Sequence, residues 1–447
     1  MQTHKDQVDA YQFMMQRMSA ALLLGDPSII EPPTRRGRNA MVAGTAVAVL
    51  VAVGFGLYGL FVPGGNKAYA EPGSIVVEKE SGSRFVFVGG ALRPTPNLAS
   101  AMLIQGERSK VTLVSRASLA DVPRGPRIGV DGLPDAVPSG RDLLYGGWLL
   151  CPVAAGNASA PGLGVNFDPS VHAVPVPPDR YVAVRTQDGR VYLLLRGAKH
   201  FVPETSTVAT LGLTAEDLPV VATTMLDLVP NGPQIAAADI PGSGRPGPIV
   251  AGSDRRVGDL FVHLAGNGTE RYFVLLDQGL APLSATEFAL LAAGQGASVS
   301  EVDAASVLSA TKARDESLLS RLPDLARMTR TDKGDGLPCL RQVSAGTEVS
   351  TTVVLSRSAD LLPARRALLP PAKGVLVAEQ PIPAGQKIPD RYLITDDGRR
   401  YLLSDNDSIK ALGLGEMQPM PMRTEVLSMI PAGPALSRRA AVTAQGG

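Results

Sequence analysis

The chain has 447 residues and a formal net charge of +1, with 43 Lys and Arg residues against 42 Asp and Glu residues. This balance gives no indication of nucleic acid or an anionic surface as a partner. The length exceeds that of one ordinary domain, and 47 glycines and 37 prolines indicate many turns. We therefore expect several small folded units rather than one large core.

The N-terminal tail, residues 1–38, is expected to carry one amphipathic helix over residues 5–24. Apolar residues recur at spacings of three and four and form one stripe, which consists of Val8, Tyr11, Met15, Met18 and Leu22. A lone helix of this length is marginal in water. We interpret the stripe as a docking face for a partner. A helix that lies on the membrane surface is the alternative, but its polar face carries few cations, which is weak for lipid binding.

Residues 40–62 form an apolar run without Asp, Glu, Lys, Arg, His, Asn or Gln. At about 1.5 Å per residue, a helix over this run spans about 34 Å, enough to cross a bilayer core of about 30 Å. We predict a transmembrane helix over residues 39–62. Arg35, Arg36 and Arg38 precede it, so the positive-inside rule places the tail in the cytoplasm and the remaining chain outside the plasma membrane.

A cleaved signal peptide is the competing interpretation of this run. The sequence Ala68-Tyr69-Ala70 has the pattern of a cleavage site. However, the preceding tail and the apolar run are both longer than those of a signal peptide. We therefore expect an uncleaved single-pass anchor.

The two cysteines, Cys151 and Cys339, fall on the predicted outer side, where disulfides persist. We predict that they pair. In the chain-entropy model, such a bridge between distant positions contributes on the order of 5 kcal/mol. Two buried free thiols are the alternative. A metal site is not expected, because the four histidines show no ligand spacing.

A pattern of strand, glycine-containing turn, strand, polar break and short helix occurs four times in the outer region. The turn glycines are Gly82, Gly189, Gly268 and Gly398. The clearest copies place strands at residues 181–185 and 190–195, and at residues 391–395 and 400–403. Irregular spacing of the glycines argues against a solenoid with a fixed period.

Further strand-like runs near the cysteines, including residues 351–355 and 374–377, indicate a central β domain made from distant segments. The predicted fold class is α+β. We assign the repeats and the two parts of the central domain to these ranges: repeat 1, 73–122; central, 123–178; repeat 2, 179–240; repeat 3, 245–328; central, 329–388; repeat 4, 389–440.

No motif in the sequence supports catalysis. The chain has no Gly-Lys dipeptide and therefore no P-loop, and it has no Gly-x-Ser-x-Gly elbow. We interpret the glycine-rich residues 242–247 as a flexible connector between repeats 2 and 3. An acidic group consists of Asp396, Asp397, Asp405 and Asp407. We expect these to be turn and helix-cap residues rather than glycosidase or calcium ligands, and we expect no cofactor or metal.

The ordered combination of these features resembles the EccB family, the membrane component EccB of actinobacterial type VII (ESX) secretion systems. The resemblance covers nearly the whole chain and includes the tail sequence from Lys5 to Arg17, the single span, four turn-centred repeats, two distant cysteines and the ending Pro431-Ala-Gly-Pro434. It implies that Cys151 and Cys339 correspond to the family's disulfide.

The resemblance also implies an elongated periplasmic part with a central β domain and four repeat domains. It implies a structural subunit of the inner-membrane secretion complex, beside EccC (an ATPase), EccD and EccE, with self-association. The repeats are similar to a cell-wall-binding phage lysin module. An extracytoplasmic ATPase or hydrolase and a wall-binding anchor are the alternative functions, and the missing P-loop argues against the ATPase.

Overall fold

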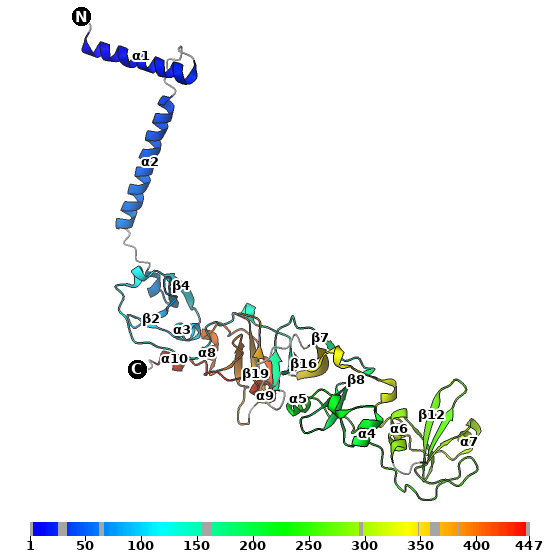
Figure 1. The fold of residues 1–447 in the computed structure, drawn as a ribbon. Coiled ribbons are helices and arrows are strands. Elements are labelled where there is room, and N and C mark those ends of the chain that lie inside the picture. The colour runs from blue at the N-terminus through cyan, green and yellow to red at the C-terminus, as the bar shows by residue number, and fades with distance from the viewer. Residues whose placement is uncertain are drawn as a thin grey trace.

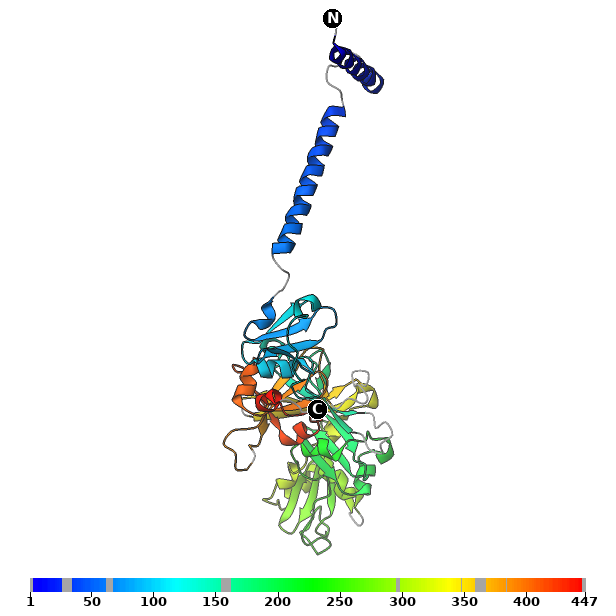
Figure 2. The ribbon, with the colours of Figure 1, turned by 90° about the vertical axis from the view of Figure 1, so that its left-hand side faces the viewer.

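The computed structural model describes residues 3–25, 34–61, 67–153, 162–294, 298–346, 348–357, 367–382 and 384–443. Two helices precede a body rich in β-strands (Figures 1 and 2). Helix α1 (His4–Leu24) ends at Gly25, whose φ of 69° is left-handed. Helix α2 (Thr34–Phe61) contains the segment Gly37–Tyr58, which is long and apolar enough to cross a membrane.

Four four-stranded sheets correspond to the four predicted repeats. In each, three antiparallel strands precede a helix, and a fourth strand lies parallel to the first. Repeat 1 contains η1 (Lys67–Ala70), β1 (Ser74–Glu78), β2 (Arg84–Val88), β3 (Ala91–Pro94), α3 (Leu98–Gln105), β4 (Lys110–Val114) and η2 (Arg116–Leu119). Repeat 2 contains β8 (Arg180–Arg185), β9 (Val191–Leu195), β10 (Ala198–Val202), α4 (Thr205–Thr210), η4 (Ala215–Asp217), α5 (Thr223–Asp227) and the distant β15 (Thr329–Arg330).

Repeats 3 and 4 have the same plan. Repeat 3 contains β11 (Leu260–Leu264), β12 (Glu270–Leu276), β13 (Gly279–Leu283), α6 (Ala285–Ala293), β14 (Val299–Glu301) and α7 (Ala304–Ser309), followed by η5 (Ser317–Leu319) and η6 (Leu325–Arg327). Repeat 4 contains β19 (Gly374–Gln380), β20 (Arg391–Thr395), β21 (Arg400–Leu403), α8 (Asn406–Ala411), β22 (Met420–Arg423), α9 (Thr424–Ser428) and α10 (Arg438–Val442).

The central sheet has six strands in the order β18-β6-β5-β16-β17-β7. Its strands are β5 (Gly147–Val153), β6 (Gly162–Asn166), β7 (Ala173–Pro175), β16 (Leu337–Ala345), β17 (Glu348–Ser356) and β18 (Ala367–Leu368), with η3 (Gly140–Asp142) and η7 (Lys333–Asp335) before its two parts. One face, with Leu150 and Leu340, packs against α5 of repeat 2 and α9 of repeat 4 in one core.

Two strands belong to a different sheet from the one that the prediction gave them. Strand β19 contains the run 374–377, which was assigned to the central domain, but it is the first strand of the sheet of repeat 4. Strand β15, at the start of the predicted second central part, completes the sheet of repeat 2. The turn of Gly398 therefore joins the second and third strands of its sheet, whereas the other three turns join the first and second. A hairpin signal identifies two neighbouring strands but not their place in the sheet.

The body consists of two halves with the same order of elements: a repeat, three strands of the central sheet and a second repeat. The spatial order of the central sheet is unchanged when β5, β6 and β7 exchange places with β16, β17 and β18. A separation of 188 residues relates Cys151 to Cys339, and the same separation relates Leu92 to Leu280 on the third strands of repeats 1 and 3.

The halves are intertwined rather than side by side. Repeat 1 shares a core with repeat 4, to which Leu103 and Leu436 belong, and repeat 3 contributes Leu290 to the core of repeat 2. Figure 1 shows the resulting line of lobes, from repeat 1 beside repeat 4, through the central sheet, to repeat 2 and repeat 3. Both ends of the body chain thus lie at the repeat 1 end of the molecule.

Candidate functional site

Cys151 and Cys339 form a disulfide at the middle of the central sheet. They occupy opposed positions on the antiparallel neighbours β5 and β16, because Leu150 pairs with Leu340. Their Cα atoms are 4.5 Å apart, which is the spacing of directly opposed residues without mutual hydrogen bonds. The predicted disulfide is confirmed, and it joins equivalent positions of the two halves.

The five stripe residues of α1 are all exposed, from 47% for Val8 to 85% for Leu22. These residues are Val8, Tyr11, Met15, Met18 and Leu22. Phe13 and Met14 are also more than half exposed, so the apolar surface of α1 is wider than the predicted stripe. An apolar helix surface of this kind is a candidate docking site.

Three arginines mark one end of the apolar helix. Arg35, Arg36 and Arg38 lie in the first turns of α2, where the segment Gly37–Tyr58 begins. The side chain of Arg38 is exposed. In the chain, these residues therefore lie between α1 and most of the apolar part of α2.

The four turn glycines all have a positive φ, between 70° and 83°. In each turn the glycine amide donates to the carbonyl oxygen three or four residues earlier, at 2.8–3.0 Å. A left-handed backbone explains why glycine stands there. These residues, Gly82, Gly189, Gly268 and Gly398, have a structural role in the hairpins.

The role of a second glycine position was not predicted from the sequence. Beside the third strand of each sheet, a later segment of the chain runs parallel to that strand. A parallel bridge in each repeat joins the two: Leu92 to Arg124, Lys199 to Asn231, Leu280 to Lys312 and Arg400 to Ala432. A Cβ atom on Gly232 would lie 2.2 Å from the His200 ring, and one on Gly433 would lie 2.2 Å from the Tyr401 ring. The signal was the shared Pro-x-Gly-Pro sequence at residues 230–233 and 431–434.

Burial favours the uncharged form of both of these facing side chains. It lowers the pKa of His200, whose Nδ1 lies 2.8 Å from the carbonyl oxygen of Pro233. Burial also raises the pKa of Tyr401, and the hydrogen bond that its hydroxyl donates to Asp397 adds to this rise. Both groups serve packing within their repeats.

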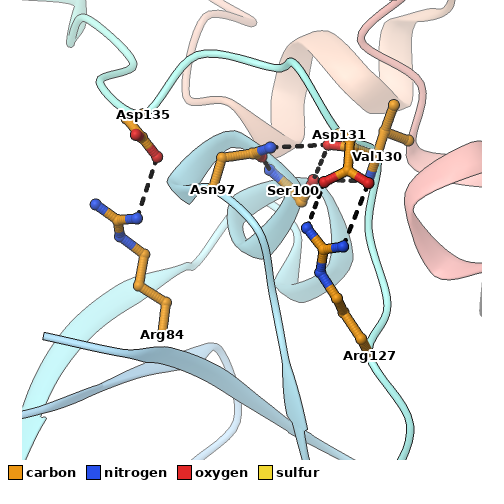
Figure 3. Close-up of polar contacts among 7 residues, drawn as sticks. All are labelled: Arg84, Asn97, Ser100, Arg127, Val130, Asp131 and Asp135. Atoms are coloured by element: carbon orange, nitrogen blue, oxygen red, sulfur yellow. Dashed lines mark hydrogen bonds and ion pairs between the residues drawn. The ribbon is translucent and has the colours of Figure 1, made fainter. Parts of the chain in front are cut away.

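The joint between repeats 1 and 4 is closed by a strap, residues 127–135 (Figure 3). Asn97 caps α3: its Oδ1 accepts from the amide of Ser100 at 2.8 Å, and its Nδ2 donates to the carbonyl of Val130 at 2.8 Å. The Oγ of Ser100 accepts from the amide of Val130 at 3.0 Å. The strap is therefore held to α3 by neutral hydrogen bonds.

Ion pairs lie at the two ends of this strap, on its exposed side. Arg84 contacts Asp135 at 3.1 Å, and Arg127 contacts Asp131 within the strap. Leu133, which lies between Asp131 and Asp135 in the sequence, is buried in the core that repeats 1 and 4 share. Exposed pairs of this kind contribute about 0–1 kcal/mol, so apolar packing carries this joint.

The glycine-rich residues 242–247 are not a flexible connector, in contrast to the prediction. Pro246 forms an antiparallel bridge with Arg256. The amides of Gly244 and Gly247 donate to carbonyls of residues 257 and 255 at 2.8 and 2.7 Å, and those of residues 243 and 245 also donate within the chain. A phosphate cradle needs such amides to be free, and these are engaged.

Three of the four acidic residues of repeat 4 are engaged in turn and cap contacts, and the fourth, Asp407, lies in the first turn of α8. Asp405 accepts from the amide of Ser408 at 2.7 Å as the N-cap of α8. Asp397 accepts from the amide of Arg399 at 3.1 Å, and Asp396 from the amide of Ala372 at 2.6 Å. Within the described part of the chain, no three His, Cys, Asp or Glu residues are grouped so that they could hold a metal ion.

A family model described as "Type VII secretion system ESX-1, transport TM domain B" matches residues 1–447. The chain belongs to the EccB family. Relatives include the ESX-3 secretion system ATPase EccB3 of Mycolicibacterium smegmatis, 27% identical over 98% of this chain and 90% of its own length. The ESX-1 secretion system ATPase EccB1 of Mycobacterium tuberculosis H37Rv is 26% identical over 98% and 94%.

Solved EccB structures have the same fold. The EccB3 dimer from the ESX-3 core complex matches with a TM-score of 0.58 and 25% identity, over 83% of this chain and 100% of that chain. A chain of an intact ESX-5 inner membrane complex matches with a TM-score of 0.61 and 24% identity, over 100% and 96%. The expected α+β fold and family are confirmed, and this EccB-family chain is a single-pass membrane protein with an extracytoplasmic region.

Proposed function

We propose that this chain is a structural subunit of the inner-membrane core complex of a type VII secretion system and is needed for protein export. Membership of the EccB family over the whole chain is the observation that carries the proposal. Relatives occur in an ESX-5 inner membrane complex and as a dimer in an ESX-3 core complex. The partners are the other membrane subunits, EccC, EccD and EccE, and a second copy of the chain.

The architecture supports a division of tasks. By the positive-inside rule, the arginines at the start of α2 support a cytoplasmic α1 and a body outside the plasma membrane. The exposed stripe of α1 docks on the cytoplasmic side of the complex. The disulfide-linked body sets distances and contacts on the outer side.

ATP hydrolysis is the function that the names of the relatives print. This chain contains no Gly-x-x-x-x-Gly-Lys-Ser/Thr sequence, and the amides of residues 243–245 and 247 are engaged within the chain. The observations therefore favour a structural role for this chain. Contact of the repeats with the cell wall stays an alternative.

Substitutions on α1 test the docking role with a matched pair of variants. Met15 lies in the stripe and Gln16 lies next to it, outside the stripe; both are exposed. Met15→Asp should reduce the chain found in the large complex at least tenfold, because burying a carboxylate in an apolar interface costs several kcal/mol. Gln16→Asp introduces the same residue and should leave assembly near wild type. Native gels of detergent-extracted membranes measure this.

Alkaline extraction of the same membranes shows whether both variants are still inserted. Full assembly of Met15→Asp, or an equal loss in both variants, would contradict docking through the stripe.

A further inference from the structure

The body has two equivalent joints, which are built with different chemistry. Helix α3 lies at the joint of repeats 1 and 4, and helix α6 lies at the joint of repeats 3 and 2, where it contacts α4. Ser100 and Glu287 occupy the same place, the third residue after the N-cap, and both are completely buried. The first is neutral and the second carries a carboxylate.

The carboxylate of Glu287 is fully paired inside the joint. Arg321 donates to it from Nε at 3.0 Å and from Nη2 at 2.8 Å, and the amide of Ala238 donates to Oε1 at 2.9 Å. The same Nη2 also donates to the carbonyl of Ala236 at 2.5 Å. Three hydrogen bonds thus connect one helix residue to two other segments, and a fourth connects these segments to each other.

These two segments are the connections between repeats 2 and 3. The chain leaves repeat 2 through residues 236–238, directly after the core residue Ile235, and it returns from repeat 3 through residues 321–325. The amide of Leu325 donates to the Oγ1 of Thr286 at 2.7 Å, one residue before Glu287. The first turn of α6 therefore holds the outgoing and the returning segment together.

We propose that Glu287 and Arg321 form an ionic latch that fixes the angle between the distal repeat 3 and repeat 2. With the latch closed, repeat 3 is a rigid extension of the body. With the latch broken, the joint is held mainly by the apolar contacts of Leu290, Leu322 and Leu325 with the core of repeat 2, and repeat 3 moves more freely on the connecting segments. Its sheet and that of repeat 2 stay folded, because neither Glu287 nor Arg321 belongs to their apolar cores.

The buried pair is sensitive to loss of either partner. Removing one member leaves a charge without its counter-charge, whereas an exposed pair contributes little. Arg327 and Asp324 form a more exposed pair at 3.3 Å, at and just after the end of the returning segment, with the Arg327 side chain 81% and the Asp324 side chain 35% exposed. This pair provides the matched control.

Distance measurements between two spin labels on the full chain in detergent test the latch. Val174 on the central sheet and Leu308 on repeat 3 are 65% and 81% exposed, and cysteines placed there take the labels because the native cysteines are paired. Glu287→Gln keeps the shape and the acceptor for Ala238, and Arg321→Met keeps most of the volume. Both should broaden the distance distribution at least twofold, and Arg327→Met should not.

Hydrogen exchange on the same variants separates a hinge from unfolding. The latch predicts faster exchange at residues 236–240 and 321–325 with unchanged protection of β11, β12 and β13. An unbroadened distribution in both latch variants would overturn the proposal. Faster exchange across the whole sheet of repeat 3 would overturn it as well, because Glu287 would then be a residue of that repeat's own core.

Discussion

At the scale of residues, glycine and its facing side chain form matched pairs in the repeats. Gly433 faces Tyr401 and Gly232 faces His200, with no space for a Cβ atom in either case. In repeat 3, Ala313 stands at the corresponding place, and the facing residue is Ala281. A larger residue in the parallel segment thus accompanies a smaller one on the strand.

Gly433→Ala tests this pairing. The added methyl group would overlap the buried ring of Tyr401, so we expect the free energy of unfolding to fall by about 1–3 kcal/mol, as for overpacked cores. Gly266 has open space around it and no positive φ, so Gly266→Ala is the control and should be near neutral. Chemical denaturation of the two variants measures the difference. Equal stability of the two variants would show that the ring yields without cost.

At the scale of elements, the last helix belongs to the first repeat as much as to the fourth. Helix α10 packs on α3, Ala441 is buried in the core shared by repeats 1 and 4, and the amide of Arg438 donates to the Oγ of Ser408 at 2.9 Å. More than three hundred residues separate α3 from α10 in the sequence. The first and the last repeat are therefore interdependent.

Removal of residues 437–447 should weaken repeat 1. We expect faster hydrogen exchange in α3, because the truncation exposes apolar surface that α10 covers. Removal of residues 444–447 alone is the control and should leave α3 protected. If exchange rises only in α8 and β21 after the larger truncation, the shared core does not stabilise repeat 1.

The sequence predicted elements better than their assembly. The Asp-Gly turns and the alternation around Gly189 and Gly398 identify hairpins, because turn chemistry acts over a few residues. The pairing of β15 with the sheet of repeat 2 and the place of β19 in the sheet of repeat 4 depend on contacts between separate segments. No local sequence pattern encodes such contacts. The disulfide could be predicted because only two cysteines exist, but its place between equivalent positions required the register of β5 and β16.

The candidate functional residues also divide into those that the sequence predicts and those that only the fold reveals. The stripe of α1 was readable, because a helix with period 3.6 brings its apolar residues to one face. Glu287 and Arg321 were not, because a charged pair has no sequence signal until the fold brings α6 to the returning segment. Gly232 and Gly433 were visible only as a repeated Pro-x-Gly-Pro sequence.

At the scale of the whole molecule, two intertwined halves form one elongated body behind a single span (Figure 1). The disulfide connects the halves at the middle of the central sheet, and the exposed helix α1 lies at the other end of the span. This arrangement suits a subunit that connects contacts on one side of a membrane to contacts on the other. The proposed docking role predicts partners on the side of α1.

Purification of the intact chain from its own membranes in mild detergent, with identification of the accompanying proteins by mass spectrometry, tests this account most directly. We expect EccC, EccD and EccE subunits of one type VII system in fixed ratios to the chain. Recovery of the chain without any of these subunits, from membranes that contain them, would contradict a structural role in the core complex.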